Sequence, residues 1–251
     1  MFTFLGDVAS FFGDSANWQG EEGIPTLFRE HLQLTVVSVL AAVIVAVPIG
    51  VVLGHRRIGG TFAIYIFNVG RALPALALLI LAVQWFGIGE PTGVLTPVHS
   101  VPAFVAMFVL ALPPILANTY VGVAEVDDDM REAARGMGMN AAQMLRRVEM
   151  PIAMPLIMAG VRTAAVAVIA TATLAAYVDA GGFGRYIVDG FAVRDSVKVF
   201  AGALLVALLA IAAELTLAWA ERRMSSPGLR AATGRRSRGR GRDRLESRPA
   251  H

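Results

Sequence analysis

Residues 32–54 read LQLTVVSVLAAVIVAVPIGVVLG, an apolar stretch without a charged side chain, and it stops at His55-Arg56-Arg57. A helix that crosses about 30 Å of hydrocarbon needs roughly 20 such residues. The stretch is therefore long enough to cross a membrane, and the basic residues that follow it suit the polar surface of a bilayer. It decides the fold class, which is that of an integral membrane protein built from helices.

Four further apolar runs follow, at residues 69–86, 101–123, 156–178 and 199–220. Together the runs predict an all-α integral membrane protein with five transmembrane helices, or six if residues 61–86 fold back on themselves. The composition agrees, because 56% of the 251 residues are hydrophobic and 16% are charged, whereas a soluble domain has about 25% charged residues. The lack of cysteine excludes disulfides, and four scattered histidines disfavour a metal site.

The positions of the arginines predict the orientation in the membrane. Four arginines lie between the third and fourth runs and ten follow the fifth, whereas residues 87–100 contain none. We therefore expect residues 1–30 to be an extracellular N-terminal segment, 31–224 the transmembrane domain and 225–251 a disordered, cytoplasmic, arginine-rich tail. Anionic lipid headgroups would attract this tail. No aromatic residue interleaves its arginines, which disfavours binding to nucleic acid.

The cytoplasmic loop between the third and fourth runs carries the strongest functional signal. Asp129 and Glu132 have the spacing of a capping box, and glycines at 136 and 138 interrupt the helix that these residues begin. Asn140, with Gln143 three positions later, predicts the start of a second helix, which we expect to end at Pro151. Two short helices about a flexible corner result. A plain hairpin that links two spans is the alternative, but about 30 residues exceed what neighbouring spans need.

This loop resembles the EAA loop of permeases in binding-protein-dependent ABC importers. The residues that carry the resemblance are Glu132, Ala133, Ala134, Gly138, Val148, Met150 and Pro151. Val148 and Met150 replace the family's usual Ile and Leu. The resemblance implies that the loop is the coupling helix seated in a groove of an ATPase subunit. In that family the glutamate caps the helix and the glycine permits the corner.

Five other stretches resemble the osmoprotectant branch of these permeases: residues 71–77, 112–120, 136–139, 157–163 and 181–184. The likeness covers about residues 25–227. It implies import of glycine betaine, choline, carnitine or a proline-like solute across a bacterial plasma (inner) membrane. The implied partners are ATPase subunits, a second permease (identical or homologous), an extracytoplasmic solute-binding protein and membrane lipids. Another small solute, such as an amino acid, is the alternative.

The energy source is expected on another polypeptide. The sequence contains no Gly-x-x-x-x-Gly-Lys-Ser/Thr phosphate loop, so we expect ATP and Mg²⁺ on the partner ATPase. We predict no catalytic residue, metal or cofactor on this chain, and do not expect an enzyme. A secondary transporter driven by an ion gradient is the alternative class, which favours carboxylates near mid-bilayer. Glu214 is the one acidic residue well inside a predicted span.

Six further residues are candidates for the transport pathway or for contact with the binding protein: Arg71, Pro74, Asn118, Tyr177, Asp179 and Gly182. Tyr177 and Asp179 lie at the outer end of the fourth predicted span, and the resemblance places Gly182 in a corner that faces the binding protein. Charged residues within spans are costly and often functional. Arg162 and Glu214 are therefore expected to pair, with each other or with another subunit, or to snorkel to the inner interface.

Overall fold

The computed structural model describes residues 2–60, 74–87 and 100–224, together with the single positions 65, 70 and 72. Every regular element within these residues is a helix. The elements are α1 (Phe2–Gly13), η1 (Ser15–Trp18), α2 (Ile24–His55), α4 (Ala75–Phe86), α5 (Val101–Ala124), α6 (Asp128–Gly136), α7 (Ala141–Met144), η2 (Leu145–Glu149), α8 (Met150–Thr171), η3 (Ala172–Val178), α9 (Gly184–Ala192) and α10 (Ser196–Met224).

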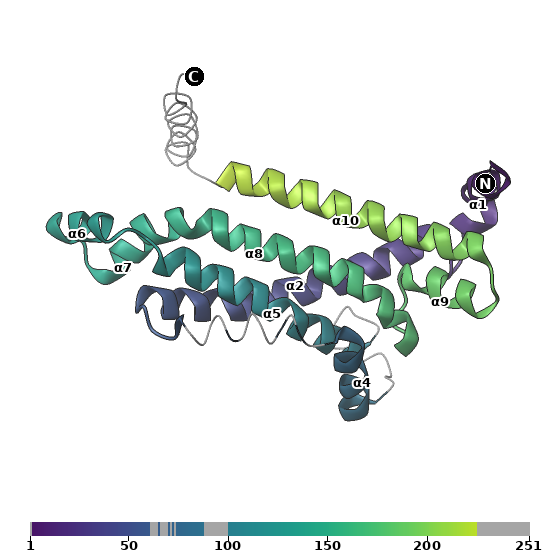
Figure 1. Cartoon of the computed structure of the whole chain (residues 1–251), viewed down its shortest axis with the longest axis horizontal. Coiled ribbons are helices and arrows are strands. Elements are labelled where there is room, and N and C mark those ends of the chain that lie inside the picture. The colour runs from purple at the N-terminus through teal and green to yellow at the C-terminus, as the bar shows by residue number, and fades with distance from the viewer. Residues whose placement is uncertain are drawn as a thin grey trace, which may run out of the picture.

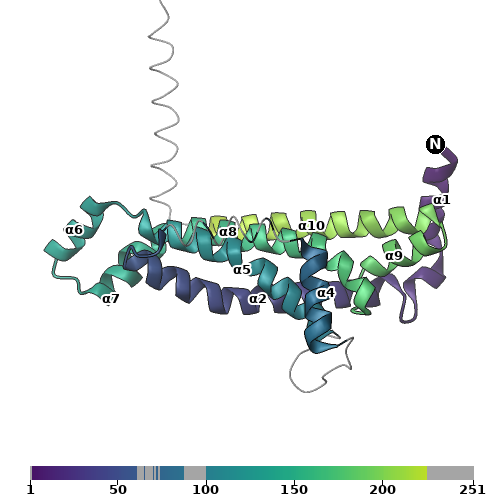
Figure 2. The same cartoon turned by 60° about the horizontal axis from the view of Figure 1, so that its bottom comes forward.

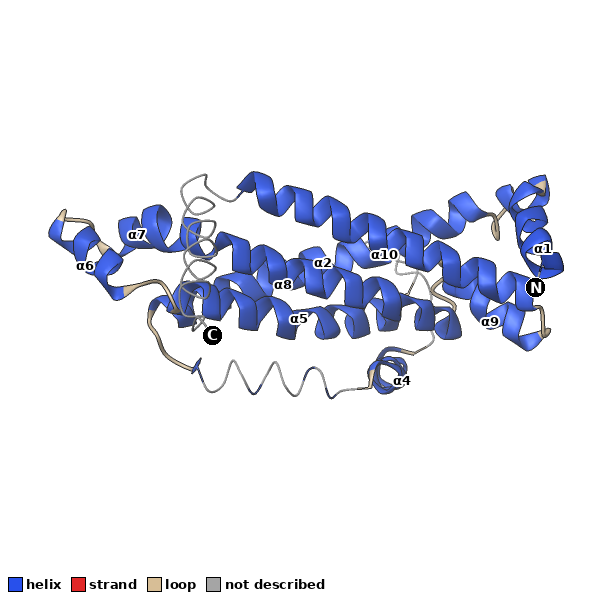
Figure 3. Cartoon of the chain, turned by 45° about the horizontal axis from the view of Figure 1, so that its top comes forward, coloured by secondary structure: helices blue, strands red, loops and turns tan. Residues whose placement is uncertain are grey.

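The helices α2, α5, α8 and α10 form an elongated bundle (Figure 1). α2 packs along α5, α5 packs along α8, and α10 lies against α8 and α9. The pair α6 and α7 projects from one end of the bundle, and α1 and α9 lie at the other end (Figure 2). α4 runs across the direction of the long helices, and Figure 3 shows it nearly end-on. The two ends of the bundle therefore carry different structures, here called the α6 end and the α9 end.

Four of the described helical stretches are long and apolar enough to cross a membrane, and they contain four of the five predicted runs. These stretches are Ile24–His55, Val101–Ala124, Ala141–Val178 and Ser196–Met224. α2 begins before its predicted run, since Pro25 at the first turn favours a helix start there. α4 covers the second half of the run at 69–86, whereas positions 66–69, 71 and 73 lie outside the described residues. The choice between five and six spans stays a prediction.

Small residues bring the long helices close together. A Cβ on Gly50 of α2 would lie 2.8 Å from the Cβ of Thr119 on α5. A Cβ on Gly160 of α8 would lie 2.8 Å from the Pro114 carbonyl oxygen on α5. Within a bilayer, such close packing replaces the hydrophobic effect as the force that holds helices together. Buried alanines, including Ala164 and Ala175, continue this core along the bundle.

At the α9 end the chain reverses between two spanning helices. η3 stops at Asp179, whose backbone is left-handed (φ 57°), and Gly181 (φ 75°) follows in the same region. α9 then runs back to α10, and α1 packs across both: Phe4 contacts Phe200, and Phe11 contacts Tyr186, each edge-to-face. The α9 end is thus a folded cap, not a simple turn.

Candidate functional site

α6 begins the projection, and Asp127 is its cap. The Asp127 carboxylate accepts a hydrogen bond from the Asp129 backbone N–H at 2.9 Å. The predicted capping box of Asp129 and Glu132 is therefore wrong, because the helix already begins at Asp128 and both residues lie inside it. Glu132 and Ala133 are exposed, whereas Ala134 is buried against the protein. The outer face of α6 is thus free for another molecule.

The predicted corner after α6 is confirmed. α6 ends at Gly136, and Gly138 adopts φ +77°, with the Gly138 N–H donating to the Arg135 carbonyl at 2.9 Å. No atom lies within 4 Å of where a Gly138 Cβ would stand. Glycine is favoured here by its backbone conformation, not by lack of room.

α7 starts with the capping box that the sequence predicted. The Asn140 side chain accepts from the Gln143 N–H at 2.9 Å, and the Gln143 side chain accepts from the Asn140 N–H at 3.0 Å. The expectation that this helix ends at Pro151 is wrong, because it continues without a break through η2 and α8. η2 is a π-turn in which the Met150 N–H bonds to Leu145, five residues back. This wider turn lies directly before Pro151 and accommodates it in the helix, although proline has no N–H to donate.

The later positions of the motif lie where the projection joins the bundle. Met150 packs, with Leu145, on a buried cluster of Val123, Ala153 and Ile157, and Val148 is half-buried. Pro151 is exposed. The motif therefore divides into an outer part at 132–138, which is mostly exposed, and a root at 148–151, where Val148 and Met150 are partly buried.

A buried ion cluster, which the sequence analysis missed, lies at this root. Glu149 is fully buried, and its Oε2 lies 2.6 Å from His55 Nδ1 at the end of α2. Its Oε1 lies 3.3 Å from Nη1 of Arg131 on α6, and Arg131 Nη2 also donates to the Val123 carbonyl at 2.7 Å. We call these three residues the Glu149 cluster. It connects α6, α2 and the start of α8 through one carboxylate.

A second, exposed ion pair reinforces the connection between α2 and α6. Arg57 Nη1 lies 2.6 Å from Asp128 Oδ1, and Arg57 Nη2 donates to the Val126 carbonyl at 3.0 Å. The hydrogen bond from Arg57 lowers the pKa of Asp128 below its usual range. Asp128 therefore stays ionised, and the pair stays charged, throughout the neutral and mildly acidic range.

A third group of charges lies between α8 and α10, and it extends from the middle of α8 to the last turn of α10. Arg162 Nε lies 3.4 Å from Glu214 Oε1, and Arg162 Nη1 lies 3.2 Å from Glu221 Oε2. We call these residues the Arg162 cluster. The expected pairing of Arg162 with Glu214 is confirmed within this chain.

The corner at the α9 end gathers three of the predicted residues. Tyr177 and Asp179 are exposed, and the Gly182 N–H donates to Glu30 Oε2 at 2.9 Å. Arg185 lies 2.7 Å from Asp179 Oδ1 and 3.4 Å from Asp189 Oδ2. A hollow of about 170 Å³ beside these residues is lined mainly by Glu21, Glu22, Glu30, Asp179 and Arg185. The corner is a charged, exposed surface held to the start of α2.

Tyr186 fixes α9 to the segment before α2. Its hydroxyl donates to the Glu22 carbonyl at 2.6 Å, and burial raises the pKa of Tyr186 to about 12. The hydroxyl therefore keeps its proton, and the hydrogen bond, at any physiological pH.

The other candidate pathway residues do not join this corner. Asn118 lies towards the α6 end of α5, where its side-chain amide donates to the Pro114 carbonyl at 2.8 Å and its Cβ faces Gly160. Pro74 caps the start of α4, and Arg71 lies outside the described residues. Asn118 thus contacts the packed helices α5 and α8, and its role in the pathway stays a prediction.

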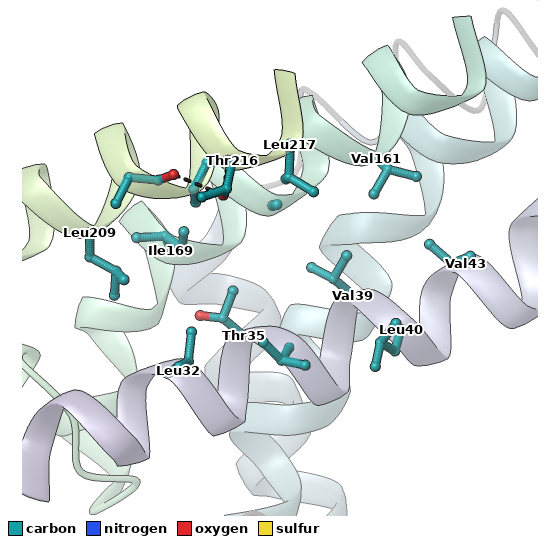
Figure 4. Close-up of a pocket in the computed structure, with 14 residues that line it drawn as sticks. Leu32, Thr35, Val39, Leu40, Val43, Val161, Ile169, Leu209, Thr216 and Leu217 are labelled. Atoms are coloured by element: carbon teal, nitrogen blue, oxygen red, sulfur yellow. Dashed lines mark hydrogen bonds between the residues drawn. The ribbon is translucent and has the colours of Figure 1, made fainter. Parts of the chain in front are cut away.

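An apolar groove of about 420 Å³ lies between α2, α8 and α10 (Figure 4). Its two polar residues are Thr35 and Thr216, and the Thr216 hydroxyl already donates to the Ala212 carbonyl at 2.8 Å. The remaining lining residues are Leu32, Val36, Val39, Leu40, Val43, Val161, Ala165, Ile169, Leu209, Ala212, Ala213 and Leu217. This lining offers almost nothing to a charged solute and suits a hydrocarbon surface.

These features define a helical membrane protein whose long apolar helices carry an exposed helical projection at one end and a charged cap at the other. Residues 46–226 match the model of the family described as "Binding-protein-dependent transport system inner membrane component". The chain belongs to this family, and it is a multi-pass membrane component of a transport system.

Several relatives cover most of the chain. It is 38% identical over 200 residues to the choline transport system permease protein OpuBB of Bacillus subtilis, covering 80% of this chain and 88% of the relative. It is 38% identical to the osmoprotectant import permease protein OsmY of Salmonella typhimurium, covering 79% and 81%. It is 37% identical to the carnitine transport permease protein OpuCB of Listeria monocytogenes, covering 81% and 88%.

The fold is also found among solved structures. A chain of the MetNI methionine ABC transporter in an inward-facing conformation matches with a TM-score of 0.66 at 22% identity, over 81% of this chain and 96% of that chain. At this identity the likeness concerns the fold alone.

Proposed function

We propose that this chain is the membrane-spanning subunit of an ATP-driven importer of a small osmoprotectant, such as choline, glycine betaine, carnitine or a proline-like solute. The family membership supports a transport subunit. The printed functions of relatives at 37–38% identity over about four fifths of the chain support this class of solute.

The observation that carries the proposal is the form of the α6–α7 projection. α6 projects beyond the end of the long helices (Figure 1). The outer residues of the projection, among them Glu132, Ala133 and Gly138, are exposed. Its root is fixed by a fully buried carboxylate. A surface that is exposed at its tip and anchored at its base suits a partner that pushes on it. We propose that the motif at 132–151 is the docking site of a separate ATPase.

The Glu149 cluster supplies a path for that motion. Arg131 belongs to α6, His55 ends α2, and Glu149 leads directly into α8. A displacement of α6 therefore acts on two spanning helices at once. We place ATP and Mg²⁺ on the ATPase subunits. In this proposal the chain transmits the conformational change of the ATPase and performs no catalysis.

The remaining partners follow from the same arrangement. We place the α6 end and the C-terminus on the cytoplasmic side and residues 1–30 outside, because of the arginine distribution. The charged corner with Tyr177, Asp179 and Gly182 then faces a solute-binding protein. Residues 31–224 form the transmembrane domain of five spans. It pairs with a second permease, and the tail at 225–251 contacts lipid.

The test compares two glycines of equal backbone conformation. Gly138→Asp and Gly20→Asp both introduce an exposed carboxylate at a positive φ (77° and 80°), with no neighbouring atom within 4 Å. Gly138→Asp is expected to abolish uptake and co-purification of the ATPase in mild detergent while the protein stays in the membrane. Gly20→Asp at the α9 end is expected to retain the ATPase. Glu132→Lys should behave like Gly138→Asp. Normal uptake by either loop variant would contradict the docking role.

A further inference from the structure

The Arg162–Glu214 pair places charge within two apolar helices, whereas Glu221, the third member of the Arg162 cluster, lies in the last turn of α10. Glu214 lies ten residues, about 15 Å, before the end of α10, and Arg162 lies twelve residues, about 18 Å, after the start of α8. Both helices belong to stretches long and apolar enough to span a membrane. The pair therefore lies within the membrane-spanning part of the protein, not at its surface.

The pair is also exposed. The Glu214 side chain is 48% accessible and the Arg162 side chain 29%. Ionisable groups in spanning helices almost always face the protein interior, a water-filled cavity or one another. Pairing with Arg162 satisfies part of the Glu214 carboxylate, but nearly half of the Glu214 side chain remains accessible. Lipid is therefore an unsuitable neighbour for this face.

α10 has two different exposed faces. Large apolar side chains at Leu208, Ile211, Leu215 and Trp219 make one of them, which suits lipid. Ala207 and Ala218 lie one or two turns from Glu214 on its own side of the helix, and they are exposed and half-buried respectively. Small side chains therefore lie near the charge, next to Ile211, which is three positions before Glu214 and borders the apolar face.

We propose that the Arg162–Glu214 face lines the water-filled passage of the assembled transporter, and that the pair binds a small solute with a cationic group. Glu214 would receive the cationic group, and Arg162 would receive the carboxylate of a zwitterionic solute. The proposal that the pair binds a solute rests on the proposed function. The proposal that the face is exposed to water does not. The apolar groove of Figure 4 lies on another side of α10 and offers no such charges.

The first experiment measures exposure to water. The chain has no cysteine, so one introduced thiol is the only one if the partner chains are also kept cysteine-free. Ala207→Cys and Ala218→Cys test the proposed face, and Leu215→Cys on the neighbouring face and Ile44→Cys on α2 are matched controls. In the full complex in membranes, a charged thiosulfonate reagent is expected to label the two alanine positions on the order of tenfold faster, because a thiolate forms only in water. Equal rates at all four positions would overturn the proposal in favour of snorkelling within lipid.

The second experiment measures contact with solute. Glu214→Gln keeps the size of the side chain and removes its charge, and it is expected to raise KM for choline uptake about tenfold or more at unchanged membrane level. Glu214→Asp should recover part of the affinity. Fast labelling with an unchanged KM would overturn the solute site alone. Wild-type protein that transports no osmoprotectant would defeat the proposed function, and the labelling pattern would still decide whether the face meets water.

Discussion

The Glu149 and Arg162 clusters each join carboxylate and cation across different helices, but they differ in their access to solvent. Glu149 has no exposed side-chain area, whereas nearly half of the Glu214 side chain is open. A fully buried carboxylate depends on every partner it has. A solvent-exposed carboxylate can still accept hydrogen bonds from water or from a ligand. Burial, and not the presence of charge, therefore separates a charged group that connects helices from one that can bind a ligand.

The two clusters also differ in what they connect. Glu149 receives His55 and Arg131 from segments far apart in the sequence and joins the projection to the bundle. Arg162 joins two neighbouring spans, α8 and α10, along their length. We therefore expect a substitution at the first cluster to change stability and coupling together. A substitution at the second should change transport with little effect on stability.

The largest effect is expected for Arg131→Met. This change leaves the Glu149 carboxylate buried with His55 as its remaining partner, and removing one member of a buried ion pair costs about 3–5 kcal/mol. The thermal transition of the purified protein in detergent should fall strongly, and ATPase binding should fall with it. The double variant Arg131→Met with Glu149→Leu removes the orphaned charge and should recover much of the loss. A double variant that is less stable than the single one would show that an orphaned Glu149 charge is not the cause of the loss.

A smaller effect on folding is expected for Glu214→Gln. The carboxylate is half-exposed and its pairing distance is 3.4 Å, so removal of its charge should change stability by about 1 kcal/mol or less. The same thermal measurement, made beside Arg131→Met, sharpens the contrast. A loss of stability as large as that of Arg131→Met would show that the second cluster is also a structural connection.

The smallest effect is expected for Asp128→Asn, which removes the exposed pair with Arg57. Exposed pairs contribute little, and uptake should fall less than about fivefold. Because the pKa of Asp128 is lowered in the folded protein, the pair contributes stability above the usual carboxyl pKa and loses it only as the pH falls through the lowered value. The difference between wild type and variant in thermal stability should therefore be constant from pH 5 to 8. A difference that disappears within that range would show that Asp128 does not stay ionised and paired with Arg57.

Local sequence signals predicted part of the projection correctly. The Asn140–Gln143 capping box and the turn at Gly138 depend on residues a few positions apart, and both are found as predicted. The cap of α6 was misassigned, because Asp127 and Asp129 are each suitable acceptors and the sequence does not say where the helix starts. Pro151 predicts a helix end, whereas in the structure a π-turn at Leu145–Glu149 lets the helix continue through Pro151.

The sequence could not place Glu149. Its partner His55 lies 94 positions away, and no local pattern brings the end of α2 to the start of α8. The sequence does predict the pairing of Arg162 with Glu214, because two charges in separate apolar runs have few other partners in a bilayer.

The sequence by itself determined the membrane-embedded helical class, the family motif and the position of the corner at Gly138. These features depend on the length of the apolar runs and on the backbone preferences of single residues, both of which act over short stretches of chain. The tertiary structure alone decided which carboxylate is sealed at the root of the projection and which is open between α8 and α10. Solvent access to a charge is set by the helices that pack around it, and those helices come from distant parts of the chain.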